Sequence, residues 1–139
     1  MRGKSLGPHL DGLVERVVGA AMTVSNTLGA GFLEKVYERA LVLELWALGI
    51  RAEEQVPYCV VYKGQEVGKF FADVLVEEEL VLELKCVDRF GNEHLAQCLN
   101  YLKASGLNVC IMLNFQRPRL EWRRVVMNHA RELAGDGRG

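Results

Sequence analysis

The sequence predicts one α/β domain with a central mixed β-sheet flanked by helices on both faces, in the order α-α-β-β-β-α-β-(β). Three observations predict this class. Apolar residues recur at intervals of three and four before residue 50, as in amphipathic helices. Shorter segments rich in valine, tyrosine and leucine follow. A further helical segment then separates two apolar runs, and such a β-helix-β unit favours parallel strands with a right-handed crossover.

Three segments carry the helical pattern. The first extends from Asp11 to Leu28, and two glycines around Ala30 end it. The second covers Phe32 to Leu48, with Gly49 as its C-terminal cap. The third covers Glu93 to Ala104, where Asn92 can cap the start and Ser105-Gly106 ends the helix.

Five segments carry the strand pattern. They are Gln55–Tyr62, Val67–Val76, Leu80–Val87, Leu107–Phe115 and, as a short last strand, Leu120–Val126. Pro57 favours an edge position or a strand start for the first of them, because proline cannot donate to the sheet. The continuous apolar run of the fourth is typical of a buried strand, which the unit predicts to lie parallel to Leu80–Val87.

Length and composition limit the class of protein. The chain has 139 residues, 50% hydrophobic and 25% charged, with a net charge of −1, which fits one globular domain over residues 11–128 between flexible tails at 1–10 and 129–139. No stretch approaches the ~20 apolar residues of a membrane span, and the N-terminus lacks the apolar run of a signal peptide. The four cysteines form no Cys-x-x-Cys pair and sit among apolar residues, so we expect buried thiols, no zinc, and a cytoplasmic protein.

Charge is distributed unevenly along the chain. Residues 72–93 contain seven acidic and two basic residues, whereas the segment from Lys103 onward contains seven basic and three acidic ones. An acidic centre beside a basic tail fits a metal site flanked by a phosphate-binding surface. Two solvated faces of opposite sign explain the same distribution, and charge alone does not separate these interpretations.

The hydrophobic pattern sets the register of the hairpin between residues 67 and 87. If Val76 lies opposite Leu80, one face carries only apolar pairs, which are Phe70/Cys86, Ala72/Leu84, Val74/Leu82 and Val76/Leu80. The other face carries Phe71/Lys85, Asp73/Glu83 and Leu75/Val81. A shift by one residue would mix the two faces. Asp73 and Glu83 are therefore predicted to be cross-strand neighbours, with Cβ atoms about 5 Å apart.

Two carboxylates at this separation repel, so a raised pKa, a cation or a metal must compensate. Lys85 lies two residues beyond Glu83 on the same face, about 7 Å along the strand. Oxygen ligands beside an ammonium group suit Mg²⁺ with a phosphate. A surface salt-bridge cluster around Lys85 is the alternative, and the hairpin by itself supports both equally.

Two helical segments add polar candidates. Glu34 and Tyr37 are three residues apart at the start of the second helix, where an acidic residue is also simply favourable for the helix dipole. In the third helix, His94, Gln97 and Tyr101 share one stripe. Such a stripe is most often the wet face of an amphipathic helix.

These residues carry a family resemblance. Gly31-x-x-Glu34-x-x-Tyr37 resembles the signature of the GxxExxY protein family, and this resemblance extends from Leu13 to Val126. Ala72-Asp73 followed by Glu83-Leu84-Lys85 is similar to the core motif of PD-(D/E)xK, restriction-endonuclease-like nucleases, with alanine in place of a proline that is not a ligand. Gln97-x-x-x-Tyr101 resembles an element of the RecB-type and lambda-exonuclease-type branches.

The resemblance implies a role for each matched position. Asp73, Glu83 and the Leu84 carbonyl would hold Mg²⁺ or Mn²⁺, and Lys85 would position or activate the attacking water. Glu34 and Gln97 would complete the catalytic set. The expected substrate contacts, which include two arginines of the basic C-terminal half, are Tyr37, Tyr101, Arg117 and Arg119.

The predicted function is metal-dependent hydrolysis of phosphodiester bonds in DNA or RNA, with no membrane partner. Two alternatives stay open. One is a non-catalytic nucleic-acid-binding or assembly module with a nuclease-like core, and the other is a regulatory protein that binds a small phosphorylated ligand in the same pocket. The sequence also leaves open whether the chain forms homo-oligomers.

Overall fold

The computed structural model describes residues 6–128 and has the predicted order of elements. The helices are α1 (Pro8–Leu28), α2 (Glu34–Ala47) and α3 (Asn92–Ser105), and the strands are β1 (Ala52–Tyr62), β2 (Gln65–Val76), β3 (Leu80–Lys85), β4 (Val109–Asn114) and β5 (Glu121–Val126). Helix α1 begins at Pro8, three residues earlier than expected, so residues 8–10 belong to a helix and not to a tail. Residues 1–5 and 129–139, where the remaining tail residues were expected, lie outside the described part of the chain.

The five strands form one mixed sheet in the order β1-β2-β3-β4-β5. Strands β3 and β4 are parallel, as the β-helix-β unit predicts, and the other neighbours are antiparallel. Pro57 lies in β1, an edge strand, where a missing N–H costs least. Every residue of β4 is buried, in agreement with its continuous apolar sequence.

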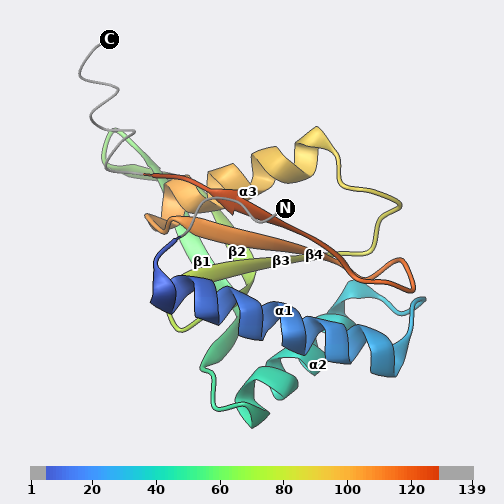
Figure 1. Ribbon diagram of the computed structural model, residues 1–139. Coiled ribbons are helices and arrows are strands. Elements are labelled where there is room, and N and C mark those ends of the chain that lie inside the picture. The colour runs from blue at the N-terminus through green and yellow to red at the C-terminus, as the bar shows by residue number, and fades with distance from the viewer. Residues whose placement is uncertain (1–5, 129–139) are drawn as a thin grey trace.

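Helices cover both faces of the sheet (Figure 1). Helices α1 and α2 pack on one face in a core that includes alternate residues of β4, namely Val109, Ile111 and Leu113. Helix α3 packs on the other face in a second core, to which β4 contributes Cys110 and Met112. Because side chains alternate across a strand, β4 supplies both cores.

The hairpin of β2 and β3 follows the predicted register only in part. Val74 pairs with Leu82, and Val76 pairs with Leu80, as predicted. Beyond Val74 the two strands stop pairing, and β2 continues beside β1 alone. Ala72 consequently packs in the α3 core and not opposite Leu84, which lies in the α1–α2 core. The predicted continuous apolar face is therefore wrong beyond Val74, and Asp73 does not pair directly with Glu83 across the strands.

The irregularity lies at Gln55. Its φ is +53°, a left-handed backbone conformation that a glutamine rarely adopts. The pairing of β1 with β2 passes over Gln55 and Asp73 and resumes between Val56 and Ala72. Side chains change face across this point, since Val74 lies in the α1–α2 core and Ala72 in the α3 core. Periodicity in the sequence gives no signal for such a change.

Two further expectations meet the structure here. The four cysteines are all free; Cys98 and Cys110 are buried and Cys86 is half-buried, but Cys59 is exposed, contrary to the expected burial of all four. Within residues 6–128, no helix is long and apolar enough to cross a membrane.

Candidate functional site

The opening between β2 and β3 is closed by two carboxylates. The backbone N–H of Leu84 donates to Asp73 Oδ2 over 2.8 Å. The backbone N–H of Cys86 donates to Glu34 Oε2 over 2.9 Å. Residues two apart in a strand direct their N–H groups toward the same edge, so side chains from β2 and α2 replace the missing strand partner there.

Between these two positions, Lys85 points to α3. Its Nζ donates to Gln97 Oε1 over 2.8 Å and lies 3.9 Å from Glu83 Oε1. The Gln97 amide in turn contacts the Tyr101 hydroxyl, with 3.4 Å between Nε2 and the oxygen. The polar stripe of α3 therefore faces the sheet at Gln97 and Tyr101. Polar stripes of this kind more commonly face the solvent. His94 instead accepts a hydrogen bond from Gly91, the N-cap residue in place of the expected Asn92.

Glu83 is the most unusual group of the site. Its side chain is almost fully buried, and among the described residues its Oε2 has no hydrogen-bond partner. Burial and the charge of Asp73 raise the pKa of Glu83 to about 9, against the opposing effect of Lys85. Burial, followed by the Glu83 charge, also raises the pKa of Tyr101. The buried Glu83 and the half-buried Asp73 and Lys85 are thus brought together.

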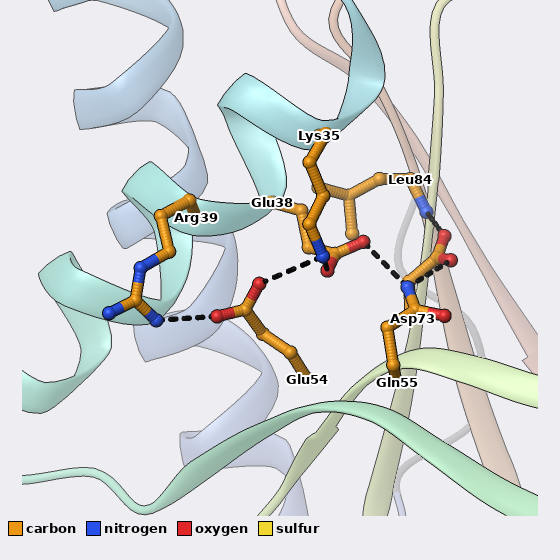
Figure 2. Close-up of polar contacts among 7 residues, drawn as sticks. All are labelled: Lys35, Glu38, Arg39, Glu54, Gln55, Asp73 and Leu84. Atoms are coloured by element: carbon orange, nitrogen blue, oxygen red, sulfur yellow. Dashed lines mark hydrogen bonds and ion pairs between the residues drawn. The ribbon is translucent and has the colours of Figure 1, made fainter.

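A second polar layer lies behind Asp73 (Figure 2). Gln55 Nε2 donates to Glu38 Oε1 over 2.9 Å and to Asp73 Oδ1 over 3.4 Å. Glu38 is buried and also accepts a hydrogen bond from Lys35 Nζ over 2.8 Å. Burial raises the pKa of Glu38, and the Asp73 charge adds to this effect. Both oxygens of Asp73 are therefore held by protein donors.

Sequence reasoning missed Glu38 and Gln55. Glu38 had a signal, because it lies four residues after Glu34 and therefore on the same side of the helix. Gln55 had none, because its approach to Asp73 depends on the positive φ within β1.

Tyr37 belongs to the core and not to the site. It is fully buried and stacks on Phe115 with 4.7 Å between ring centroids. Its hydroxyl donates to the Gly29 carbonyl over 2.6 Å and accepts from the Phe32 N–H over 3.2 Å. The structure therefore corrects the expected substrate contact: Tyr37 has no exposed surface, and it closes the loop that leads into Glu34.

This position of Tyr37 predicts a structural phenotype for Tyr37→Phe. The change leaves the ring in place and removes one hydroxyl that serves two backbone groups, so we expect a loss of about 1–2 kcal/mol in the free energy of unfolding. Chemical denaturation measures this loss, with the exposed Tyr62→Phe as a matched control that should change little. A drop in nuclease activity or Mn²⁺ affinity without a loss of stability would return Tyr37 to the site.

The four arginines of the described segment 103–128 divide into two groups. Arg123 is exposed but lies over the Phe90 ring, and the half-buried Arg124 pairs with Asp11 over 3.6 Å, so both guanidinium groups already have a partner within the protein. Arg117 is exposed and donates to the Asp88 carbonyl in the loop after β3. Arg119 is exposed in the same β4–β5 loop. Arg117 and Arg119 thus leave guanidinium surface open to solvent.

The ligand set available to a metal is small. Among residues 6–128, no three His, Cys, Asp or Glu side chains gather as a metal-binding group. The site offers two carboxylates, from Asp73 and Glu83, and the backbone carbonyl of Leu84, which lies between Glu83 and Lys85 in the chain. Mg²⁺ often binds through only one or two carboxylates and keeps several waters. The Oε2 of Glu83, which has no hydrogen-bond partner in the described part of the chain, is the atom that a cation would satisfy.

The chain is similar to one family model and to two solved structures. Residues 11–125 match a family model described as the PD-(D/E)XK nuclease superfamily. A search of curated proteins finds no match. A solved structure, "Crystal structure of SSO0001", is similar with a TM-score of 0.56 and 19% identity. The match covers 73% of this chain and 55% of the solved chain, so this chain spans about half the length of that protein. An alkaline exonuclease from Laribacter hongkongensis is similar with a TM-score of 0.48 and 12% identity, over 86% of both chains.

Proposed function

Because the chain belongs to the PD-(D/E)XK nuclease superfamily, we propose that it hydrolyses phosphodiester bonds of DNA or RNA with Mg²⁺ or Mn²⁺. The observation that carries the proposal is the buried Glu83, which lies beside Asp73 and Lys85 and whose Oε2 has no hydrogen-bond partner within residues 6–128. A buried carboxyl oxygen without a hydrogen-bond partner lowers stability. A site for a cation and a phosphate explains why the fold retains it.

Asp73 and Glu83, with the Leu84 carbonyl, would hold the cation. Hard oxygen ligands of this kind suit Mg²⁺ and Mn²⁺ and not the softer metals. When bound, the metal supplies a water of lowered pKa and draws negative charge from the phosphate oxygens.

Besides the metal, Lys85 provides a positive charge at the site from the protein itself. Gln97 accepts a hydrogen bond from its ammonium group and so fixes the side chain between Glu83 and α3. A cation held in advance at this point stabilises the charge that develops on the phosphate, because it need not reorganise during the reaction. Glu34 holds the chain immediately after Lys85 through the Cys86 N–H. We also propose GxxExxY membership, because Tyr37 closes the loop that precedes Glu34.

A groove beside the site offers a path for the substrate. It lies between the β1–β2 hairpin and α3, has a volume of about 970 Å³, and includes Gln97 and Tyr101 of the site. Phe70 and the neighbouring valines of β1 form an apolar wall, and Lys103 is a cation among its lining residues. Apolar walls with a few polar groups suit nucleobases next to a charged backbone. We propose that one strand lies in this groove, with Arg117 and Arg119 as further phosphate contacts.

Cleavage assays test the function directly. The purified protein is incubated with single- and double-stranded DNA and RNA in Mg²⁺, Mn²⁺ or EDTA. We expect products with Mg²⁺ or Mn²⁺, and none in EDTA or with Glu83→Gln. Salt-dependent binding without cleavage would instead support the non-catalytic module, and binding of a small phosphorylated ligand alone would support a regulatory protein. The cytoplasmic location of the protein and its homo-oligomerisation stay predictions.

A further inference from the structure

We propose that Glu38 and Gln55 are positioning residues that hold the Asp73 carboxylate at the open edge of β3. The proposal rests on the proposed nuclease function of this site. Neither residue touches the reacting atoms; Gln55 acts on Asp73 directly, and Glu38 acts through Gln55 (Figure 2).

The hydrogen bonds form one continuous path through four elements. It starts in α2, where Lys35 holds the buried Glu38. It crosses to Gln55 on β1, to Asp73 on β2, and ends at the Leu84 N–H on β3. A carboxylate fixed on both oxygens has one orientation, and a ligand held in this way needs little reordering when it binds a cation.

The chemistry of the amide suits its place. The NH₂ group of glutamine has two donors and no charge, so it can serve two carboxylates at once. Here Nε2 contacts both Glu38 and Asp73, whose charges repel. A neutral double donor therefore keeps the two acids near each other without cancelling the charge of Asp73.

The backbone of Gln55 supports the same inference. Glycine would adopt its φ of +53° without strain, and asparagine would adopt it more easily than glutamine does. The backbone conformation at this position therefore does not explain why the residue is a glutamine. Strained residues persist where a function requires them, and the function available here is the bridge to Asp73.

Gln55→Gly separates the two roles of this residue. Glycine relieves the backbone strain but removes the amide bridge. Relief of strain and loss of the hydrogen bond to the buried Glu38 oppose each other, so we expect a melting temperature close to that of the wild type, together with weaker control of Asp73. Gln55→Asn keeps an amide and tolerates the positive φ, but its shorter side chain cannot span both carboxylates, so the same result is expected.

The direct readout needs neither metal nor activity. Because Asp73 accepts the hydrogen bond of the Leu84 N–H, a loosened Asp73 should speed hydrogen exchange at that amide. We expect roughly tenfold faster exchange in Gln55→Gly, measured by NMR in EDTA. The Cys86 amide is an internal control, because its acceptor is Glu34. Mn²⁺ affinity, measured by calorimetry, should fall roughly tenfold.

Variants at Glu38 test the outer half of the path. Glu38→Gln keeps an oxygen that can accept from Gln55 Nε2, so it should preserve most of the protection of Leu84. Glu38→Leu removes that oxygen and should match Gln55→Gly. Glu44→Gln is the matched control, because Glu44 lies on the same helix but its side chain has no bond to Glu38, Gln55 or Asp73 among the described contacts.

The results separate this proposal from the proposed function. If Leu84 exchanges at the wild-type rate in a folded Gln55→Gly protein, positioning by Gln55 is overturned even if the wild type cleaves nucleic acid. If exchange at Leu84 rises but the wild type cleaves none of the substrates, the nuclease function is overturned and the positioning role stands. Equal effects of Glu44→Gln and Glu38→Leu would overturn the role of Glu38.

Discussion

Replacing Lys85 with alanine is expected to slow phosphodiester cleavage by roughly 10²–10³-fold, with Mn²⁺ affinity equal to that of the wild type or slightly higher. Lys85 is the cation that Gln97 holds near Glu83. Its loss removes charge stabilisation from the transition state. It also removes a positive charge that opposes metal binding by repulsion, which explains the opposite sign of the two effects.

Asp73→Asn should give the reverse pattern. The substituted amide keeps an oxygen to accept from the Leu84 N–H, but it lacks the charge of a metal ligand. Mn²⁺ binding should weaken outright. In EDTA the variant should melt close to the wild-type temperature. Loss of the Asp73 charge, which raises the pKa of both Glu83 and Glu38, is favourable, whereas the new NH₂ group cannot accept from Gln55 Nε2 as Asp73 Oδ1 does.

Calorimetric titration with Mn²⁺, melting curves in EDTA and single-turnover cleavage distinguish the two variants. Lys63→Ala is the matched control for Lys85→Ala, because Lys63 is an exposed lysine in the β1–β2 turn. If Asp73→Asn binds Mn²⁺ normally and melts well below the wild type, the carboxylates form a structural ion cluster and not a metal site. Normal cleavage by Lys85→Ala would remove the catalytic role of the lysine.

The sequence could predict the fold because the local signals agree with one another. Helical and strand periods, the glycine breaks and Pro57 all favour the observed elements, and the apolar pairing fixes Val74 opposite Leu82. The prediction failed at Asp73, because the strict alternation that it assumed stops at Gln55. A single residue with positive φ turns the chain, and no pattern of residue types encodes that turn.

The site was harder to predict than the fold because its parts meet only in space. Glu34, Gln97 and Asp73 lie far apart in the chain, yet they contact three consecutive residues at the end of β3. The motif resemblance suggested that they act together. Their actual partners are the backbone N–H groups of Leu84 and Cys86 and the Lys85 ammonium group, and hydrogen bonds to backbone N–H groups leave no trace in sequence.

Glu83→Gln should have the clearest dependence on pH. In the metal-free protein the pKa of Glu83 is raised from about 4.5 to about 9, chiefly by burial and then by Asp73. Between these two pH values the folded state keeps a proton that the unfolded state has lost. Wild-type stability is therefore expected to have its full Glu83 contribution below pH 4.5, to fall as the pH rises, and to level off above about 9.

Glutamine does not titrate and has nearly the shape of a protonated glutamate, so Glu83→Gln should abolish this part of the pH dependence. In EDTA the variant and the wild type should melt at similar temperatures near pH 4.5. Near pH 9 the variant should melt at a higher temperature than the wild type. Glu38 also has a raised pKa, but it is present in both proteins, so the difference between the two melting curves isolates Glu83. Melting curves across this range, read in EDTA, give the measurement.

The same carboxyl group must lose its proton to bind a cation, so wild-type Mn²⁺ affinity should rise with pH over the range in which metal-free stability falls. Glu83→Gln should lose Mn²⁺ binding at every pH. A side chain that only supports the fold cannot produce both results, because its removal would lower stability. If wild-type stability in EDTA does not change across this range, Glu83 is ionised with a partner of its own, and the buried unpartnered oxygen no longer supports a cation site.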